Sequence, residues 1–72
     1  RFVRNVLIAL GNSGDPALAE RAAVLLDDPS ELVRGAAIWA LGRLDAERFA
    51  TEKAQRSDTE IDPDVAAEWA QA

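Results

Sequence analysis

The stretch DPSELVRGAAIWALGRL, residues 28–44, decides the fold of this 72-residue chain. We expect a helix over about Pro29 to Leu44, opened by a variant capping box in which Asp28 is the cap and Glu31 follows three residues later. Its apolar residues form one wide band, at Leu32, Val33, Ala36, Ala37, Ala40, Leu41 and Leu44. Small or apolar residues also occupy much of the rest, at Gly35, Ile38, Trp39 and Gly42. Such a helix is predicted to be covered on more than one side.

Upstream, the stretch ALGNSGDP, residues 9–16, predicts the end of one helix and the start of another. Apolar residues recur at helical spacing from Phe2 to Leu10, and Gly11 then stands where a left-handed cap is common. Asp15 is expected to cap the next helix, with Pro16 in its first turn, where the missing N–H costs nothing.

Downstream, the chain predicts two further helices. Asp45 is expected to cap a fourth helix that runs from Ala46 to about Arg56, and the Asp62–Pro63 pair repeats the cap-and-proline start for a fifth. The sequence therefore predicts an all-α fold of four to five short helices in antiparallel pairs.

The first and the third predicted helices are related by an internal sequence repeat. Aligning RFVRNVLIALG with ELVRGAAIWALG by their final glycines gives a shift of 31 residues, and aligning them by their Val-Arg pairs gives 30. Paired helices that recur at this period are typical of a helical solenoid. We expect one repeat over about residues 1–27, a second over about 28–57 and the start of a third at 62–72.

The amino-acid composition limits which catalytic and metal-binding groups these residues can supply. The chain has no cysteine and no histidine, which excludes thiolate and imidazole ligands and the mechanisms built on them. No catalytic, cofactor-binding or metal-binding residue is predicted. The net charge is −5, but residues 1–44 hold five basic and five acidic residues, so the whole acidic excess lies from Asp45 onward. No apolar run is long enough to cross a bilayer, and we expect a cytoplasmic chain with no membrane contact.

Residues 28–44 resemble the HEAT-like repeat of the phycobilisome-lyase type, through Asp-Pro, then Val-Arg, spaced alanines and Ala-Leu-Gly. A closer resemblance, in RFVRNVLIALGNSGDPAL, LLDDPSELVRGAAIWALGRL and DPDVAAEW, is to the C-terminal HEAT-like domain of epoxyqueuosine reductase, an iron-sulfur cluster-binding family. The third Val-Arg pair expected by this pattern is interrupted at Ala66. The resemblance implies a piece of a longer oxidoreductase, whose N-terminal catalytic domain holds cobalamin and 4Fe-4S clusters, and none of these cofactors in these residues.

The same resemblance implies a role in docking the anticodon stem-loop of a tRNA in queuosine synthesis. Candidate docking residues are Arg1, Arg4, Asn5, Arg34 and Arg43. Guanidinium groups bind phosphate oxygens bidentately. Two alternatives stay open for single residues: Arg34 pairs with an acidic residue of a neighbouring loop, and Trp39 either fills the space left by Gly35 and Gly42 or stacks on an unpaired base. The alternative function is a protein–protein interaction scaffold of another multidomain protein.

Overall fold

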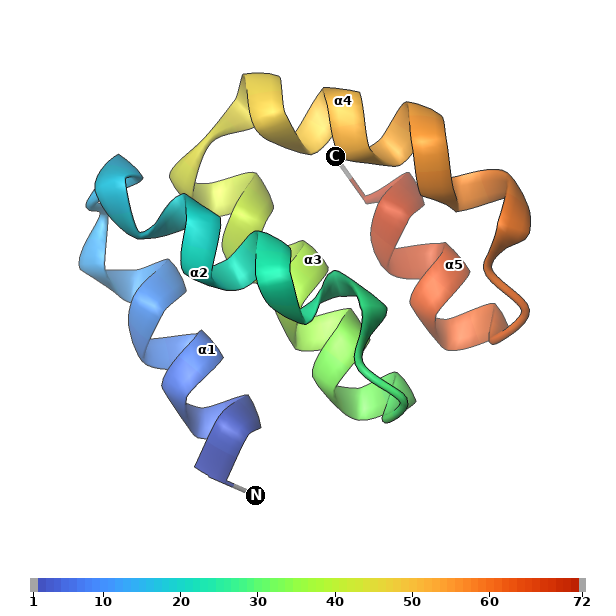
Figure 1. Ribbon diagram of the computed structural model, residues 1–72, viewed down its shortest axis with the longest axis horizontal. Coiled ribbons are helices and arrows are strands. Elements are labelled where there is room, and N and C mark those ends of the chain that lie inside the picture. The colour runs from blue at the N-terminus through green and yellow to red at the C-terminus, as the bar shows by residue number, and fades with distance from the viewer. Residues whose placement is uncertain (1, 72) are drawn as a thin grey trace.

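The computed structural model describes residues 2–71, which form five α-helices joined by short turns and contain no strand (Figure 1). The helices are α1 (Phe2–Ser13), α2 (Ala19–Val24), α3 (Glu31–Leu44), α4 (Ala46–Arg56) and α5 (Pro63–Ala70). Three 3₁₀ turns flank them: η1 (Pro16–Leu18), η2 (Leu25–Asp27) and η3 (Ser57–Thr59). The predicted all-α class is confirmed.

Helix α3 is the centre of the fold. It packs against α1, α2, α4 and α5, and its buried residues are Val33, Ala37, Ile38, Ala40, Leu41 and Leu44. The prediction that this helix is covered on more than one side is therefore confirmed. The expected burial of Leu32 is wrong, because this side chain is 59% exposed. It lies on an open face of α3, in a groove between α1 and α5.

Two of the four predicted α-helix starts, at Asp45 and Asp62, are found where the sequence places them. At Asp15 the 3₁₀ turn η1 begins at Pro16, and α2 itself begins at Ala19. The Asp15 carboxylate accepts a hydrogen bond from the Ala17 amide, and Asp45 accepts one from the Arg48 amide. Asp62 accepts from the amides of the first turn of α5, directly before Pro63. A carboxylate at this position satisfies amides that have no partner inside the helix.

The start of α3 differs from the prediction. Its cap is Ser30, whose hydroxyl accepts from the Val33 amide, and the helix begins at Glu31 instead of Pro29. Asp28 instead accepts a hydrogen bond from the Ser30 amide at 2.9 Å. The Asp28 carboxylate closes this local turn, and the cap position falls two residues further along the chain, at Ser30.

The end of α1 also differs from the prediction, because the helix continues past Gly11 to Ser13. Gly14 takes the left-handed backbone conformation, with φ of 71°, and ends the helix. Gly11 has another role: a Cβ atom there would lie 2.5 Å from Cζ3 of Trp39. The glycine lets α1 approach the indole more closely than any side chain would allow.

The prediction that Trp39 fills the space left by Gly35 and Gly42 is therefore wrong. A Cβ atom on Gly35 would meet Glu68 of α5, and one on Gly42 would meet Phe49 of α4. Glycines on the same helix as a tryptophan make room for neighbouring helices, while the indole itself reaches across to α1. Spacing along one helix could not reveal this.

Helices α1, α3 and α5 lie side by side and run in the same direction (Figure 1). The ends of α1 and α3 meet where Arg43 Nε donates to the Gly11 carbonyl oxygen, 3.3 Å away. The beginnings of α3 and α5 meet where Arg34 binds Glu60, just ahead of α5. Helix α2 returns from the end of α1 toward the start of α3, and α4 leads from the end of α3 toward α5 (Figure 1). The repeat boundaries within the chain stay a prediction.

Candidate functional site

A groove of about 560 Å³ follows the open face of α3, and α1, α3, α5 and the residues that cap α5, Asp62 and Gln71, line it. Gly35 and Ala36 form part of its floor, with Leu32 toward one end of α3 and Trp39 toward the other. The wall on α1 consists of every fourth residue: Arg4, Ile8 and Asn12. Because these spacings place residues on one face of a helix, the groove follows from the packing of three parallel helices.

The charges around this groove are unevenly distributed. Its lining contains four carboxylates, on Glu31, Asp62, Asp64 and Glu68, and a single guanidinium, on Arg4. All four carboxylates belong to α3, to α5 or to the cap of α5, and Arg4 stands on the opposite wall. The groove is thus acidic along α5 and basic at one point of α1.

The predicted docking residues occupy different surroundings. Arg1 lies outside the described residues. Arg4 and Asn5 are exposed on α1, and only Arg4 lines the groove. Arg43 lies near the other end of α1, because it hydrogen-bonds Gly11, seven residues or about 10 Å along the helix from Arg4. The structure therefore brings Arg4, Asn5 and Arg43 to the α1 side of the molecule.

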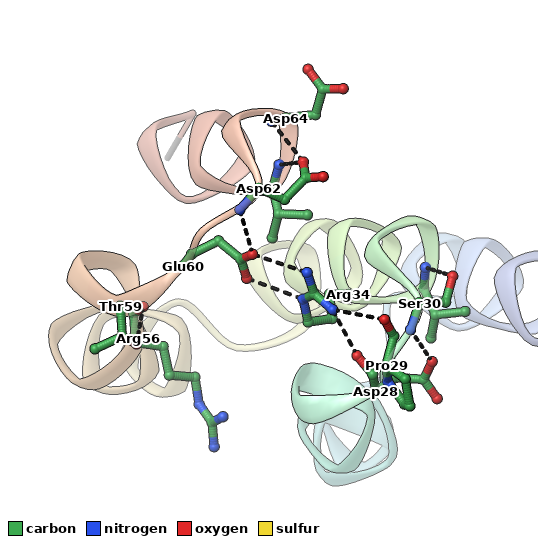
Figure 2. A network of polar contacts seen from close by, with 11 residues as sticks. Asp28, Pro29, Ser30, Arg34, Arg56, Thr59, Glu60, Asp62 and Asp64 are labelled. Atoms are coloured by element: carbon green, nitrogen blue, oxygen red, sulfur yellow. Dashed lines mark hydrogen bonds and ion pairs between the residues drawn. The ribbon is translucent and has the colours of Figure 1, made fainter.

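Arg34 is separate from this group and lies in a network of internal contacts (Figure 2). Its Nε and Nη2 donate to the two carboxylate oxygens of Glu60 at 3.1 and 3.0 Å. Its Nη1 donates to the carbonyl oxygens of Asp28 and Pro29 at 2.9 and 3.1 Å. This geometry favours the interpretation of Arg34 as a partner of a neighbouring loop, and a phosphate contact by Arg34 stays a prediction.

The Arg34–Glu60 pair ties two loops to α3. Only 17% of the Arg34 side chain and 10% of the Glu60 side chain are exposed. The bidentate hydrogen bond from Arg34 lowers the pKa of Glu60, and the same bond raises the pKa of Arg34. The Asp62 amide also donates to Glu60, at 3.0 Å. The pair therefore fixes the loop before α5 relative to the loop before α3, and with it one end of the groove.

Trp39 is half-buried and lies toward the end of the groove farther from Leu32. It packs against the core and against Gly11, and the Arg43 guanidinium lies 5.3 Å from the centre of its ring. An arginine over an indole is a favourable cation–π contact. The contacts support a packing role for Trp39, and base stacking by this residue stays a prediction.

A second charged network, on α4, was not predicted from the sequence. Glu52 is 7% exposed and accepts hydrogen bonds at 2.8 Å from Nε of both Arg48 and Arg56. Arg48 also binds Glu20, and Arg56 also binds Asp27, so the network joins α4 to α2 and η2. Hydrogen bonds from Arg56 and Arg48 lower the pKa of Glu52. The spacing of four residues along α4 is the signal that could have revealed the inner part of this network.

The side chains of residues 2–71 can be compared with the requirements of a metal site, a membrane span and a binding groove. Within residues 2–71, no three histidine, cysteine, aspartate or glutamate side chains are placed to hold a metal ion. Over the same residues, no helix is long and apolar enough to span a membrane. What the groove presents is an apolar floor, carboxylates, one guanidinium and the amides of Asn12 and Gln71.

Parallel helices stacked on one side of a shared core, with an open groove between them, define an α-helical repeat module. The chain belongs to the HEAT repeat family, because the family model described as HEAT repeats matches residues 3–72. Searches of curated proteins and of solved structures found no match.

Proposed function

We propose that this HEAT module is a non-catalytic part of an epoxyqueuosine reductase and helps to dock the anticodon stem-loop of the tRNA that the enzyme reduces. The resemblance in residues 1–18, 25–44 and 62–69 supports the choice of enzyme. The structural observation that carries the docking role is the charge of α1. This helix exposes Arg4 and Asn5 and has no acidic residue, whereas each of the other four helices has at least one.

The arginines on the α1 side have N–H groups that can donate hydrogen bonds to a polyanion such as RNA. Within residues 2–71, Arg4 has neither a hydrogen bond nor an ion pair, and Arg43 donates only from Nε to the Gly11 carbonyl. Their remaining N–H groups suit phosphate oxygens, which arginine binds as a planar fork. By contrast, Arg34, Arg48 and Arg56 already bind carboxylates. RNA would therefore approach α1 and avoid the acidic α5 side.

The cofactors of the proposed enzyme do not fit these residues. Iron-sulfur clusters are held by cysteine thiolates, and the chain contains no cysteine. In the proposed enzyme, 4Fe-4S clusters and cobalamin would be bound elsewhere, and this module would contribute position and charge only. A longer chain containing the Cys-x2-Cys-x2-Cys-x3-Cys spacing would support this assignment, and one made of further HEAT units would favour a scaffold.

A salt titration tests the docking role. The affinity of the chain for a synthetic anticodon stem-loop is measured by fluorescence anisotropy across a range of salt concentrations. Arg4→Ala should weaken binding and reduce the slope of log K against log salt by about 0.7 to 0.9, the value for one phosphate contact. Arg21→Ala is the matched control, because Arg21 is exposed on α2 and makes no ion pair among residues 2–71. Parallel lines for wild type and Arg4→Ala would contradict the proposal.

A further inference from the structure

We propose that the groove between α1, α3 and α5 binds a basic amphipathic helix of a partner protein. This inference goes beyond tRNA docking, since it concerns the acidic wall of the groove and a partner of opposite charge. It stands on three features of the described residues: the shape of the groove, its apolar floor and the carboxylates of its α5 wall.

The shape of the groove fits a helix. The α1 wall from Arg4 to Asn12 and the floor from Glu31 to Trp39 each span eight residues, or about 12 Å at 1.5 Å per residue. Gly35 lies between them, and the nearest side-chain atom to a Cβ placed there, Cγ of Glu68, is 3.8 Å away. A helix of two or more turns could lie along α3 with its side chains close to this glycine.

The floor of the groove requires apolar groups from its occupant. Leu32 is 59% exposed there, with Ala36, Ile8 and Trp39 further along the same surface. Burying this leucine under another apolar side chain removes its surface from water, which is favourable in proportion to the area covered. A purely polar cation such as a polyamine would leave the floor uncovered, so the floor favours a peptide.

The charge of the groove specifies the polar face of that peptide. Glu31 and Asp64 lie in the first turns of α3 and α5, where negative charge stabilises a helix, and Asp62 caps α5. Glu68 has no such role, because it lies in the second half of α5 and its carboxylate has no hydrogen bond or ion pair within residues 2–71. Lysine or arginine side chains of the bound helix would pair with Glu68 and its three acidic neighbours.

Designed peptides provide the test. The probe is a helical 14-residue peptide with leucines at positions i and i+4 on one face and lysines beside them. Two comparison peptides replace either all lysines by glutamate or both leucines by glutamine. Isothermal titration calorimetry of the 72-residue chain should show binding of the first peptide alone, weakened by added salt. Equal binding of the glutamate peptide, or of the glutamine peptide, would overturn the proposal.

Variants locate the binding in the groove. Glu31→Gln together with Glu68→Gln should raise the dissociation constant about 5- to 10-fold at low salt, whereas Glu47→Gln, an exposed site on α4 away from the groove, should leave it unchanged. Gly35→Leu places a side chain over the floor and should abolish binding while the chain stays folded, as circular dichroism would show. Unchanged affinity in either groove variant would overturn the proposal, as would displacement of the peptide by an equal concentration of spermine.

Discussion

The contact between α1 and α3 and the attachment of α4 are maintained by different forces. Helix α1 packs on α3 and buries Leu7, and at one point Gly11 lies directly against the indole of Trp39 with no side chain between. Helix α4 buries only Phe49 and Glu52, and ion pairs join it to α2 and η2. The first contact depends on shape and should respond to a single methyl group. The second combines the buried ring of Phe49 with ion pairs, and its ionic part should respond to salt and pH.

The largest effect is expected from the one aromatic cluster that gives α4 an apolar anchor. Trp69 of α5 is 2% exposed, and its ring centre lies 5.3 Å from that of Phe49. Trp69→Ala should lower the free energy of unfolding by about 3–5 kcal/mol, because it leaves a cavity between α4 and α5. Urea unfolding followed by circular dichroism measures this. Trp39→Ala is the comparison and should cost less, since Trp39 is only half-buried; an equal or larger loss would contradict the contrast.

The shape-dependent contact is tested next by Gly11→Ala. The new methyl group would lie 2.5 Å from the Trp39 ring, so α1 or the indole must move. We expect a loss of about 1–3 kcal/mol, as for other overpacked cores.

Gly35→Ala is the matched control for this prediction. It adds the same methyl group to α3, at a point where the nearest atom is 3.8 Å away. Alanine should then stabilise the helix by about 0.5–1 kcal/mol. If both variants shift the urea midpoint in the same direction, the close contact at Gly11 does not limit the packing of α1.

Glu60→Gln tests the buried ion pair before α5. Arg34 lowers the pKa of Glu60 below its ordinary value of 4.5, so the pair stabilises the fold above that pH and loses this contribution as the pH falls toward the lowered value. The variant should be less stable at pH 7 by about 1–2 kcal/mol, as expected for charge-assisted hydrogen bonds.

The difference from wild type should shrink as the solution is acidified below about pH 4. Thermal unfolding at several pH values measures it. Asp58→Asn removes an exposed carboxylate that lies outside the five α-helices and has no ion pair in residues 2–71, and it should follow the wild-type profile. A difference between Glu60→Gln and wild type that is constant with pH would refute the electrostatic account of this loop.

The smallest effect is expected at the surface end of the α4 network. Asp27 is 75% exposed and pairs with Arg56, and Asp27→Asn should cost only about 0.2–1 kcal/mol. The loss should disappear in 1 M salt, which screens exposed pairs. Asp58→Asn, at another exposed carboxylate nearby, should have no effect. A salt-independent loss at Asp27 would show that the pair acts through packing.

Local sequence predicted the parts of this protein that depend on neighbours along the chain. Asp45 and Asp62 cap α4 and α5, and Asp15 caps the 3₁₀ turn η1 that leads into α2, because a carboxylate at that position meets the free amides within three residues. The apolar content of residues 28–44 likewise showed that α3 would be covered on several sides. The same local logic failed at Asp28, where two competing local turns were possible and the hydrogen bond to Ser30 decided between them.

The contacts between residues of different helices were decided by the tertiary structure. The role of Gly11, the exposure of Leu32 and the choice of Glu60 as the partner of Arg34 depend on which faces of α1, α3 and α5 meet. The groove also exists only after these three helices lie parallel, when carboxylates from residues 31 to 68 come to share one surface. Spacing along a chain fixes the face of a single helix. The angle and separation between helices come from the packing of all of them together, and those determine which charges and apolar groups become neighbours.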